Sequence, residues 1–222
     1  MNENQLREQI AELGKSLYDR GLAHGSAGNI SIRLANGNFL LTPTNSCLGR
    51  LDPAKISKLD ANGKLVNGDP PSKESFLHLA MYQERQKSAA VVHLHSLHAV
   101  AVSCLADINP NDVFPPITAY AIMQVGKLAL VPYYPPGDPS LADAVRKLAG
   151  GHHAVLLANH GPVVAGTSLT AAVNAIEELE QTAHLMLLLR GQKTRLLTAA
   201  EVAELNRRFP SQTALQCASR KQ

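Results

Sequence analysis

The spacing of hydrophobic residues predicts helices at both ends of the chain. Leucine and isoleucine recur at three- and four-residue intervals over residues 3–20, and Gly21 then provides a helix stop. The same helical spacing returns over residues 169–189 and, for a shorter stretch, over residues 201–208. Three further short helices are predicted, over residues 75–86, 99–105 and 141–148.

The first third of the chain instead has the pattern of strands and hairpins. Asn36-Gly37 is a hairpin turn signal between an alternating segment at residues 30–33 and the apolar residues 39–41. A second hairpin is predicted around Asn62-Gly63. Apolar runs further along predict strands over residues 91–96, 128–131, 154–158 and 162–165. Short strands surrounded by helices predict the α/β class, as a three-layer αβα sandwich with a mostly antiparallel central sheet.

Length and composition favour one domain over residues 1–222, because a chain with 45% hydrophobic residues can bury a sizeable core. The tail after residue 210 is expected to be poorly ordered or to dock on a neighbouring subunit. The net charge is only +3, acidic and basic residues are interspersed, and tryptophan is absent. We therefore expect no nucleic-acid partner, since such partners call for basic patches and aromatic platforms.

The ends and the cysteines bear on the compartment. The N-terminus is polar and lacks the apolar core of a signal peptide. The most apolar helix carries Glu177, Glu178 and Glu180, so we expect no membrane span. There are 3 cysteines, an odd number without CxxC spacing, which favours a reducing compartment. A cytoplasmic protein is the resulting expectation.

Three histidines are the strongest candidates for chemistry. His93 and His95 are separated by one residue in a predicted strand, so their side chains point to the same face with Cα atoms about 7 Å apart. His160 ends another apolar run and is followed by a turn glycine. Three imidazoles with a fourth position open are typical of catalytic zinc. A single histidine at a strand end is more often merely packed, so only the set of three carries the metal hypothesis.

Two small or polar segments are candidates for anion binding. Gly28 and Asn29 belong to a glycine-containing loop whose backbone amides could approach an anion, although it is not a Walker A loop and could be a plain loop. Ser72 is a plausible N-cap of the helix at 75–86, a position where free amides bind phosphate, and Lys73 adds positive charge there. Glu74 could simply complement the helix dipole.

Five short motifs, taken in order, resemble the class II aldolase/adducin superfamily. They are Gly28-Asn29-Ile30-Ser31, Thr42-Pro43-Thr44, Pro71-Ser72-Lys73-Glu74, His93-Leu94-His95 and Asn159-His160-Gly161. The resemblance covers roughly residues 5–208. It implies an αβα sandwich assembled as a four-fold homotetramer, with one divalent metal ion per subunit, usually Zn²⁺, held by three histidines.

The resemblance also implies roles for individual residues. His93, His95 and His160 match the metal ligands. Glu74 matches a glutamate that acts as acid and base and can also bind the metal before substrate arrives. Tyr120 matches a catalytic tyrosine that the aldolases lend across a subunit boundary. The positions that match the phosphate-binding site are Asn29, Thr44, Ser72 and Lys73, and Asn45 stands beside them where the aldolases usually have glycine.

Lys73 is the main departure from the aldolases, which typically read Ser-Ser-Glu at this point. An ammonium group suits a substrate that carries a carboxylate in addition to its phosphate. Together with the Pro-Tyr-Tyr-Pro-Pro-Gly-Asp stretch at residues 132–138, Ser72-Lys73-Glu74 resembles the decarboxylase branch of the superfamily. That resemblance implies a phosphorylated sugar acid as substrate, a 3-oxo-tetronate 4-phosphate, which would be converted to dihydroxyacetone phosphate and CO2.

Two alternatives stay open from the sequence. The first is another reaction at the same metal, as in a fuculose-phosphate-like aldolase, an epimerase or a dehydratase. The second is a non-catalytic, adducin-like binding protein without metal. The intact set of three histidines together with Glu74 argues against the second alternative.

Overall fold

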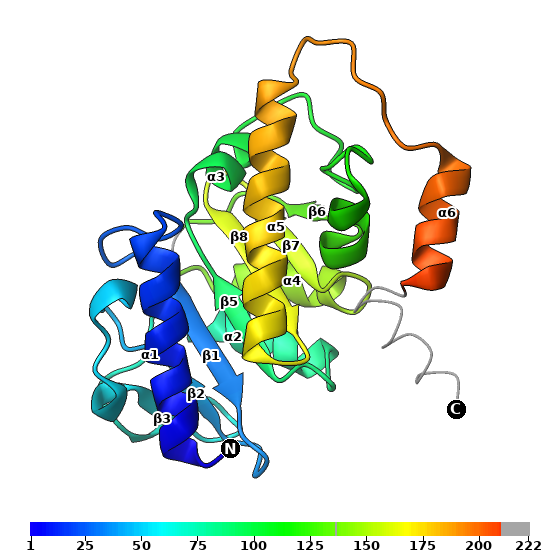
Figure 1. Cartoon of the computed structure of the whole chain (residues 1–222). Helices are drawn as coiled ribbons and strands as arrows, with labels where there is room; N and C mark the ends of the chain where they lie inside the picture. Colours follow the sequence, from blue (N-terminus) through cyan, green and yellow to red (C-terminus); the bar gives the residue numbers. More distant parts are fainter. Residues whose placement is uncertain (136, 210–222) are drawn as a thin grey trace.

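The computed structural model describes residues 1–135 and 137–209, and this part of the chain contains one sheet of eight strands in the order β4-β3-β2-β1-β5-β8-β7-β6 (Figure 1). The strands are β1 (Asn29–Arg33), β2 (Phe39–Leu41), β3 (Ser57–Leu59), β4 (Leu65–Asn67), β5 (Ala90–His93), β6 (Ala129–Val131), β7 (Ala154–Leu157) and β8 (Gly161–Gly166). Neighbouring strands are antiparallel, except for the parallel pair of β6 and β7. The predicted mostly antiparallel sheet is therefore confirmed.

Helices cover both faces of this sheet. The principal ones are α1 (Glu3–Asp19), α2 (Ser75–Glu84), α3 (Leu97–Ser103), α4 (Ser140–Ala149), α5 (Leu169–Leu188) and α6 (Ala199–Arg208), with a short π-helix η3 (Ala121–Val125). Side chains of α1, α3 and α5 contribute to one apolar cluster, and those of α2 and α4 contribute to a second cluster on the opposite face. Figure 1 shows α1 and α5 in front of the sheet with α2 and α4 behind it. The three-layer αβα architecture is confirmed.

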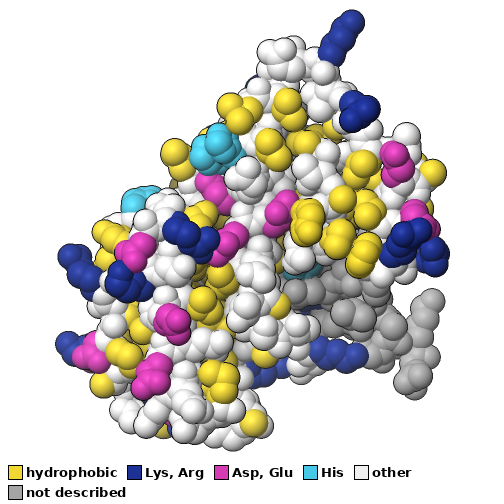
Figure 2. All heavy atoms as spheres, in the orientation of Figure 1, with side chains coloured by type: hydrophobic (Ala, Val, Ile, Leu, Met, Phe, Trp, Pro, Cys, Tyr) yellow, Lys and Arg dark blue, Asp and Glu magenta, His cyan; other side chains and the backbone are white. Residues whose placement is uncertain are grey.

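The surface has no single dominant charge on the face shown in Figure 2. Basic and acidic side chains of the described residues lie among one another there, and neither sign gathers into a broad patch. None of the described helices is both long and apolar enough to cross a membrane.

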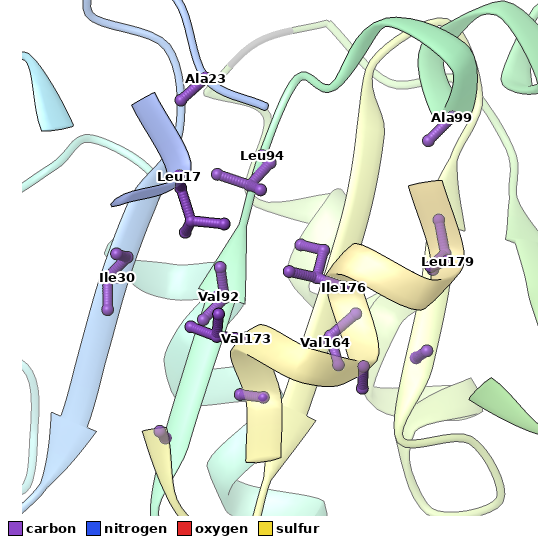
Figure 3. Close-up of a cluster of buried hydrophobic side chains, with 14 of the residues drawn as sticks. Leu17, Ala23, Ile30, Val92, Leu94, Ala99, Val164, Val173, Ile176 and Leu179 are labelled. Atoms are coloured by element: carbon purple, nitrogen blue, oxygen red, sulfur yellow. The ribbon is translucent and has the colours of Figure 1, made fainter. Parts of the chain in front are cut away.

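The central strands are buried on both faces, which fixes which way each side chain points. Ile30, Val92 and Val164 lie on the face covered by α5, where Val173 and Ile176 pack against them (Figure 3). Successive strand residues point to opposite faces. The residues that alternate with these, including Ser31 and Val91, therefore face α2 on the other side of the sheet. This second face leads directly to the candidate site.

Two local predictions differ from the structure. Glu74, not Ser72, is the residue before the first turn of α2, and the Ser72 hydroxyl instead accepts a hydrogen bond from the Glu74 N–H at 3.2 Å. His160 lies in the turn between β7 and β8 rather than at a strand end, because the strand stops at Leu157. Residues 120–124, for which the sequence pattern predicted neither helix nor strand, overlap the π-helix. The expectation for the tail after residue 210 concerns residues outside the described part.

Candidate metal centre and acid–base site

His93 is the last residue of β5 and is held in one orientation. It is fully buried, and its Nδ1–H donates a hydrogen bond to the Pro162 carbonyl oxygen at 2.8 Å. Burial lowers the pKa of His93 to about 4, so the ring is neutral near pH 7. With the ring proton on Nδ1, the lone pair of Nε2 is free to act as a ligand.

The other two histidines bring their ring nitrogens to the same point. Nε2 of His95 lies 3.0 Å from Nε2 of His93 and 3.1 Å from Nε2 of His160. Zinc–nitrogen bonds of about 2.0–2.1 Å at tetrahedral angles would place two such nitrogens about 3.3 Å apart. Burial also lowers the pKa of His95, which favours the neutral form that a metal requires. The donor set therefore fits a divalent ion.

Close backbone packing makes this convergence possible. His160 immediately precedes Gly161, whose φ is +151°, and a Cβ atom at that glycine would lie only 2.3 Å from the Leu94 carbonyl oxygen. Leu94 stands between His93 and His95. Glycine is thus required where the start of β8 approaches the segment that carries the two other histidines.

Glu74 completes the group at the start of α2. Its Oε1 lies 3.0 Å from His160 Nε2, its Oε2 lies 3.5 Å from His93 Nε2, and one ligand atom from each of the four residues lies within 4.8 Å of the others. Burial raises the pKa of Glu74, but the contact with His160, the field of His93 and a hydrogen bond from Asn29 together hold it well below its ordinary value. The carboxylate is therefore ionised at neutral pH.

A chain of buried hydrogen bonds extends from Glu74 into the protein. Asn29 Nδ2 donates to Glu74 Oε2 at 2.7 Å, and Asn29 Oδ1 lies 2.5 Å from His78 Nε2. His78 Nδ1 lies 2.7 Å from the Ser31 hydroxyl, which is 2.8 Å from the Tyr82 hydroxyl. Burial lowers the pKa of His78 to about 3 and raises that of Tyr82, so both side chains are neutral.

Sequence reasoning gave no role to His78, Ser31 or Tyr82. A signal for them was nevertheless present. Residues 74, 78 and 82 recur at four-residue spacing on one helix, and residues 29 and 31 alternate on one strand. Polar residues at both of these regular spacings are what a shared buried network between a helix and a strand requires.

A cavity of about 790 Å³ opens beside the four candidate ligands. It is lined by Glu74, His95 and His160, and also by Gly21, His24, Leu97, Val100, Tyr133, Tyr134 and Asn159. Its volume suits a small-molecule ligand. The sequence reasoning assigned no role to His24 or Asn159. A second cavity of about 640 Å³ between η3 and α6 is mainly apolar and contains none of the candidate residues.

The residues predicted to bind phosphate lie in two neighbouring loops, except for Asn29. Pro43 and Pro71 form an antiparallel bridge, and the Thr44 N–H donates to the Pro70 carbonyl oxygen at 2.9 Å. This pairing brings Thr44 and Asn45 beside Ser72 and Lys73. Ser72 is buried and Lys73 is exposed. Asn45 has a φ of +55°, a left-handed conformation that glycine and asparagine adopt more easily than other residues.

Asn29 and Tyr120, the other two predicted site residues, do not belong to these two loops. The carboxamide of Asn29 is 4% exposed and already contacts Glu74 and His78, which a role in phosphate binding does not explain. Tyr120 is 62% exposed and is not among the residues that line the cavity at the histidines.

The fold and this group of residues define a known class of protein. The family described as Class II Aldolase and Adducin N-terminal domain matches residues 8–187, and the chain belongs to it. Within the family, the chain is 50% identical to 3-oxo-tetronate 4-phosphate decarboxylase of Escherichia coli strain K12 over 203 residues, which cover 91% of this chain and 96% of that protein.

Two further comparisons are with an aldolase and with a solved structure. L-fuculose phosphate aldolase of Methanococcus maripaludis strain DSM 14266 is 36% identical over 186 residues, covering 83% of this chain and 98% of that protein. The crystal structure of YgbL from Escherichia coli superposes with a TM-score of 0.90 at 49% identity, covering 91% of this chain and 98% of the other. The similarity to decarboxylases is thus greater than the similarity to this aldolase.

The first prediction concerns metal binding. Purified protein should contain one divalent ion per chain, and His93→Ala or His160→Ala should lose it because each removes one of three converging nitrogens. Elemental analysis after dialysis measures this. His184→Ala, a change in a partly exposed histidine on α5, is the control and should retain the ion. Full occupancy in a His93→Ala/His95→Ala double variant would contradict the proposed ligands.

Proposed function

We propose that this protein is a metal-dependent lyase that decarboxylates a 3-oxo-tetronate 4-phosphate to dihydroxyacetone phosphate and CO2. The observation that carries the proposal is the convergence of three histidine Nε2 atoms and the Glu74 carboxylate beside one cavity. The activity that the relatives' names give supports the choice of substrate. We further propose that the chain is one domain of a cytoplasmic homotetramer.

His93, His95 and His160 would hold the ion, which we propose to be Zn²⁺, and Glu74 could be a further ligand before substrate arrives. Imidazole nitrogen with carboxylate oxygen is a donor set that zinc favours. A bound divalent ion supplies positive charge where negative charge develops on the substrate, which is commonly a large catalytic contribution.

Proton delivery is the task that falls to Glu74. Loss of CO2 breaks the bond between the carboxylate carbon and its neighbour, and the electron pair stays on the substrate as an enediolate. That carbon must then gain a proton, so the reaction consumes one proton overall. Glu74 lines the cavity and would take a proton from water and deliver it to this carbon. General acid–base catalysis of this kind contributes about 10²–10⁴-fold.

The two neighbouring loops would hold the substrate at a distance from the reacting bond. Thr44, Asn45, Ser72 and Lys73 offer backbone amides, hydroxyls and one ammonium group for the phosphate or the carboxylate. Binding energy gained there would orient the substrate at Glu74. Asn29, which the resemblance also places at the phosphate, donates to Glu74, and this contact supports a role beside Glu74. For Tyr120 we propose a role only across a subunit boundary.

The proposed reaction predicts a particular product. Wild-type protein should release CO2 from at least one member of a panel of phosphorylated 3-oxo acids, and it should release little aldehyde from fuculose 1-phosphate. Both products are measured by coupled assays on the metal-loaded protein. Efficient aldol cleavage without CO2 release would favour the aldolase alternative. Absence of both activities and of bound metal would favour the adducin-like alternative.

A second prediction from this mechanism concerns Glu74. Glu74→Gln keeps the size of the side chain and removes its basic oxygen, so kcat should fall by about 10²-fold or more while metal and substrate still bind. Glu178→Gln, at a partly buried carboxylate on α5, is the control and should keep normal turnover. Near-normal kcat in Glu74→Gln would leave Glu74 as a charge at the start of a helix.

A third prediction concerns Lys73 and the doubly anionic substrate. A charge-assisted contact contributes roughly 1.5–3 kcal/mol, so Lys73→Ser should raise KM by roughly 10–100-fold. Metal content should not change, because Lys73 is not a ligand. Lys64→Ser, at another exposed lysine, is the control. Unchanged KM and kcat in Lys73→Ser would leave Lys73 as a solvent-facing residue.

A further inference from the structure

The buried chain behind Glu74 has no role in the proposed reaction as described so far. It joins Glu74 to Asn29, His78, Ser31 and Tyr82, and each of the last four residues is at most 4% exposed. Its members come from β1 and from the start and body of α2, and about forty residues separate these two elements in the sequence. Buried polar side chains are costly unless their hydrogen bonds are satisfied, so a chain of this length needs an explanation.

The position of every hydrogen atom in the chain follows from the first contact. A carboxylate only accepts hydrogen bonds, so Asn29 must turn its amide nitrogen toward Glu74 and its oxygen toward His78. His78 must then carry its proton on Nε2, which leaves Nδ1 as an acceptor. The Ser31 hydroxyl donates to that Nδ1, and the Tyr82 hydroxyl donates to Ser31 Oγ.

The chain is not a route for protons, because the Asn29 carboxamide interrupts it. An amide cannot accept a proton on one side and release one on the other as a hydroxyl or an imidazole can. The network can therefore act only by holding groups in place. Its far end is itself fixed, since the Arg33 guanidinium lies 4.6 Å from the centre of the Tyr82 ring and donates to the Tyr82 carbonyl oxygen at 2.6 Å.

We propose that His78, acting through Asn29, is a positioning residue that fixes the orientation of the Glu74 carboxylate, with Oε2 held as a hydrogen-bond acceptor and Oε1 turned toward His160. Oε1 is the oxygen that lies 3.0 Å from His160 Nε2. Ser31 and Tyr82 support His78 in the tautomer that this requires. The inference rests on the proposed function in so far as it concerns proton transfer to substrate.

The kinetic test compares two substitutions of His78. His78→Leu removes the donor to Asn29, so kcat should fall by about 10–100-fold through misorientation of Glu74. KM should not change, because the two loops that carry Thr44 and Ser72 are not touched. His78→Gln can still present an amide N–H to Asn29 Oδ1 and should recover much of the loss. Turnover is expressed per folded, metal-loaded chain.

A matched control separates positioning from simple destabilisation. His153 is also a fully buried histidine, and burial lowers its pKa to about 4, but its Nδ1–H donates to the Ala165 carbonyl oxygen at 3.3 Å, far from Glu74 and Asn29 in the hydrogen-bond network. His153→Leu should lower stability and leave kcat of the folded protein unchanged. Equal kcat in wild type, His78→Leu and His78→Gln would overturn the proposal, as would a rise in KM with unchanged kcat.

The tautomer gives a test that needs no substrate. In ¹⁵N-histidine-labelled protein, nuclear magnetic resonance should show His78 protonated at Nε2 and unprotonated at Nδ1, with the signal assigned by its loss in His78→Gln. A proton on Nδ1 would overturn the inferred arrangement whatever the activity. Absence of CO2 release by the wild type would instead refute the proposed function, so the two failures are distinguishable.

Discussion

The pairing of β5 with β1 and β8 is the constraint on which the rest of the site depends. Its register sets Asn29 opposite His93 on one side and Val163 opposite His93 on the other. Because strand side chains alternate, a slip of one residue would turn His93 into the apolar layer beneath α5 and bring Val92 to the site. The apolar packing of Ile30, Val92 and Val164 therefore also specifies where the polar groups lie.

Much of the fold follows from local patterns. The amphipathic spacing of α1 and α5 and the Asn-Gly turns were sufficient to predict the helices and hairpins, since these elements depend on residues close in sequence. The predicted N-cap of α2, Ser72, was wrong, because its hydroxyl accepts a hydrogen bond from the Glu74 N–H instead of capping the helix. Neither helix nor strand was predicted for the stretch that forms η3, because a π-helix has no simple hydrophobic period.

The residues of the candidate site also divide into some that could be predicted from the sequence and some that could not. His93, His95 and His160 could be proposed because the metal hypothesis needs only residue type and a position in a strand or just after an apolar run. His78 and Ser31 could not, because they lie 47 residues apart in the chain and become partners only when α2 packs on β1. Read alone, His78 sits among apolar residues of a short helix. Polar groups that are buried on folding and satisfied by one another are the part that local patterns express least.

Gly161 gives the candidate metal site a property that its candidate ligands alone do not explain. The start of β8 touches the Leu94 carbonyl so closely that the distance between the two backbones is set by contact, not by side-chain choice. His160 precedes this contact on one segment, and His95 follows it on the other. The spacing of the His160 and His95 imidazoles therefore depends on the spacing of two backbones as well as on the side-chain torsions. Any variation that separates those segments would change the size of the ion that fits, even with every ligand retained.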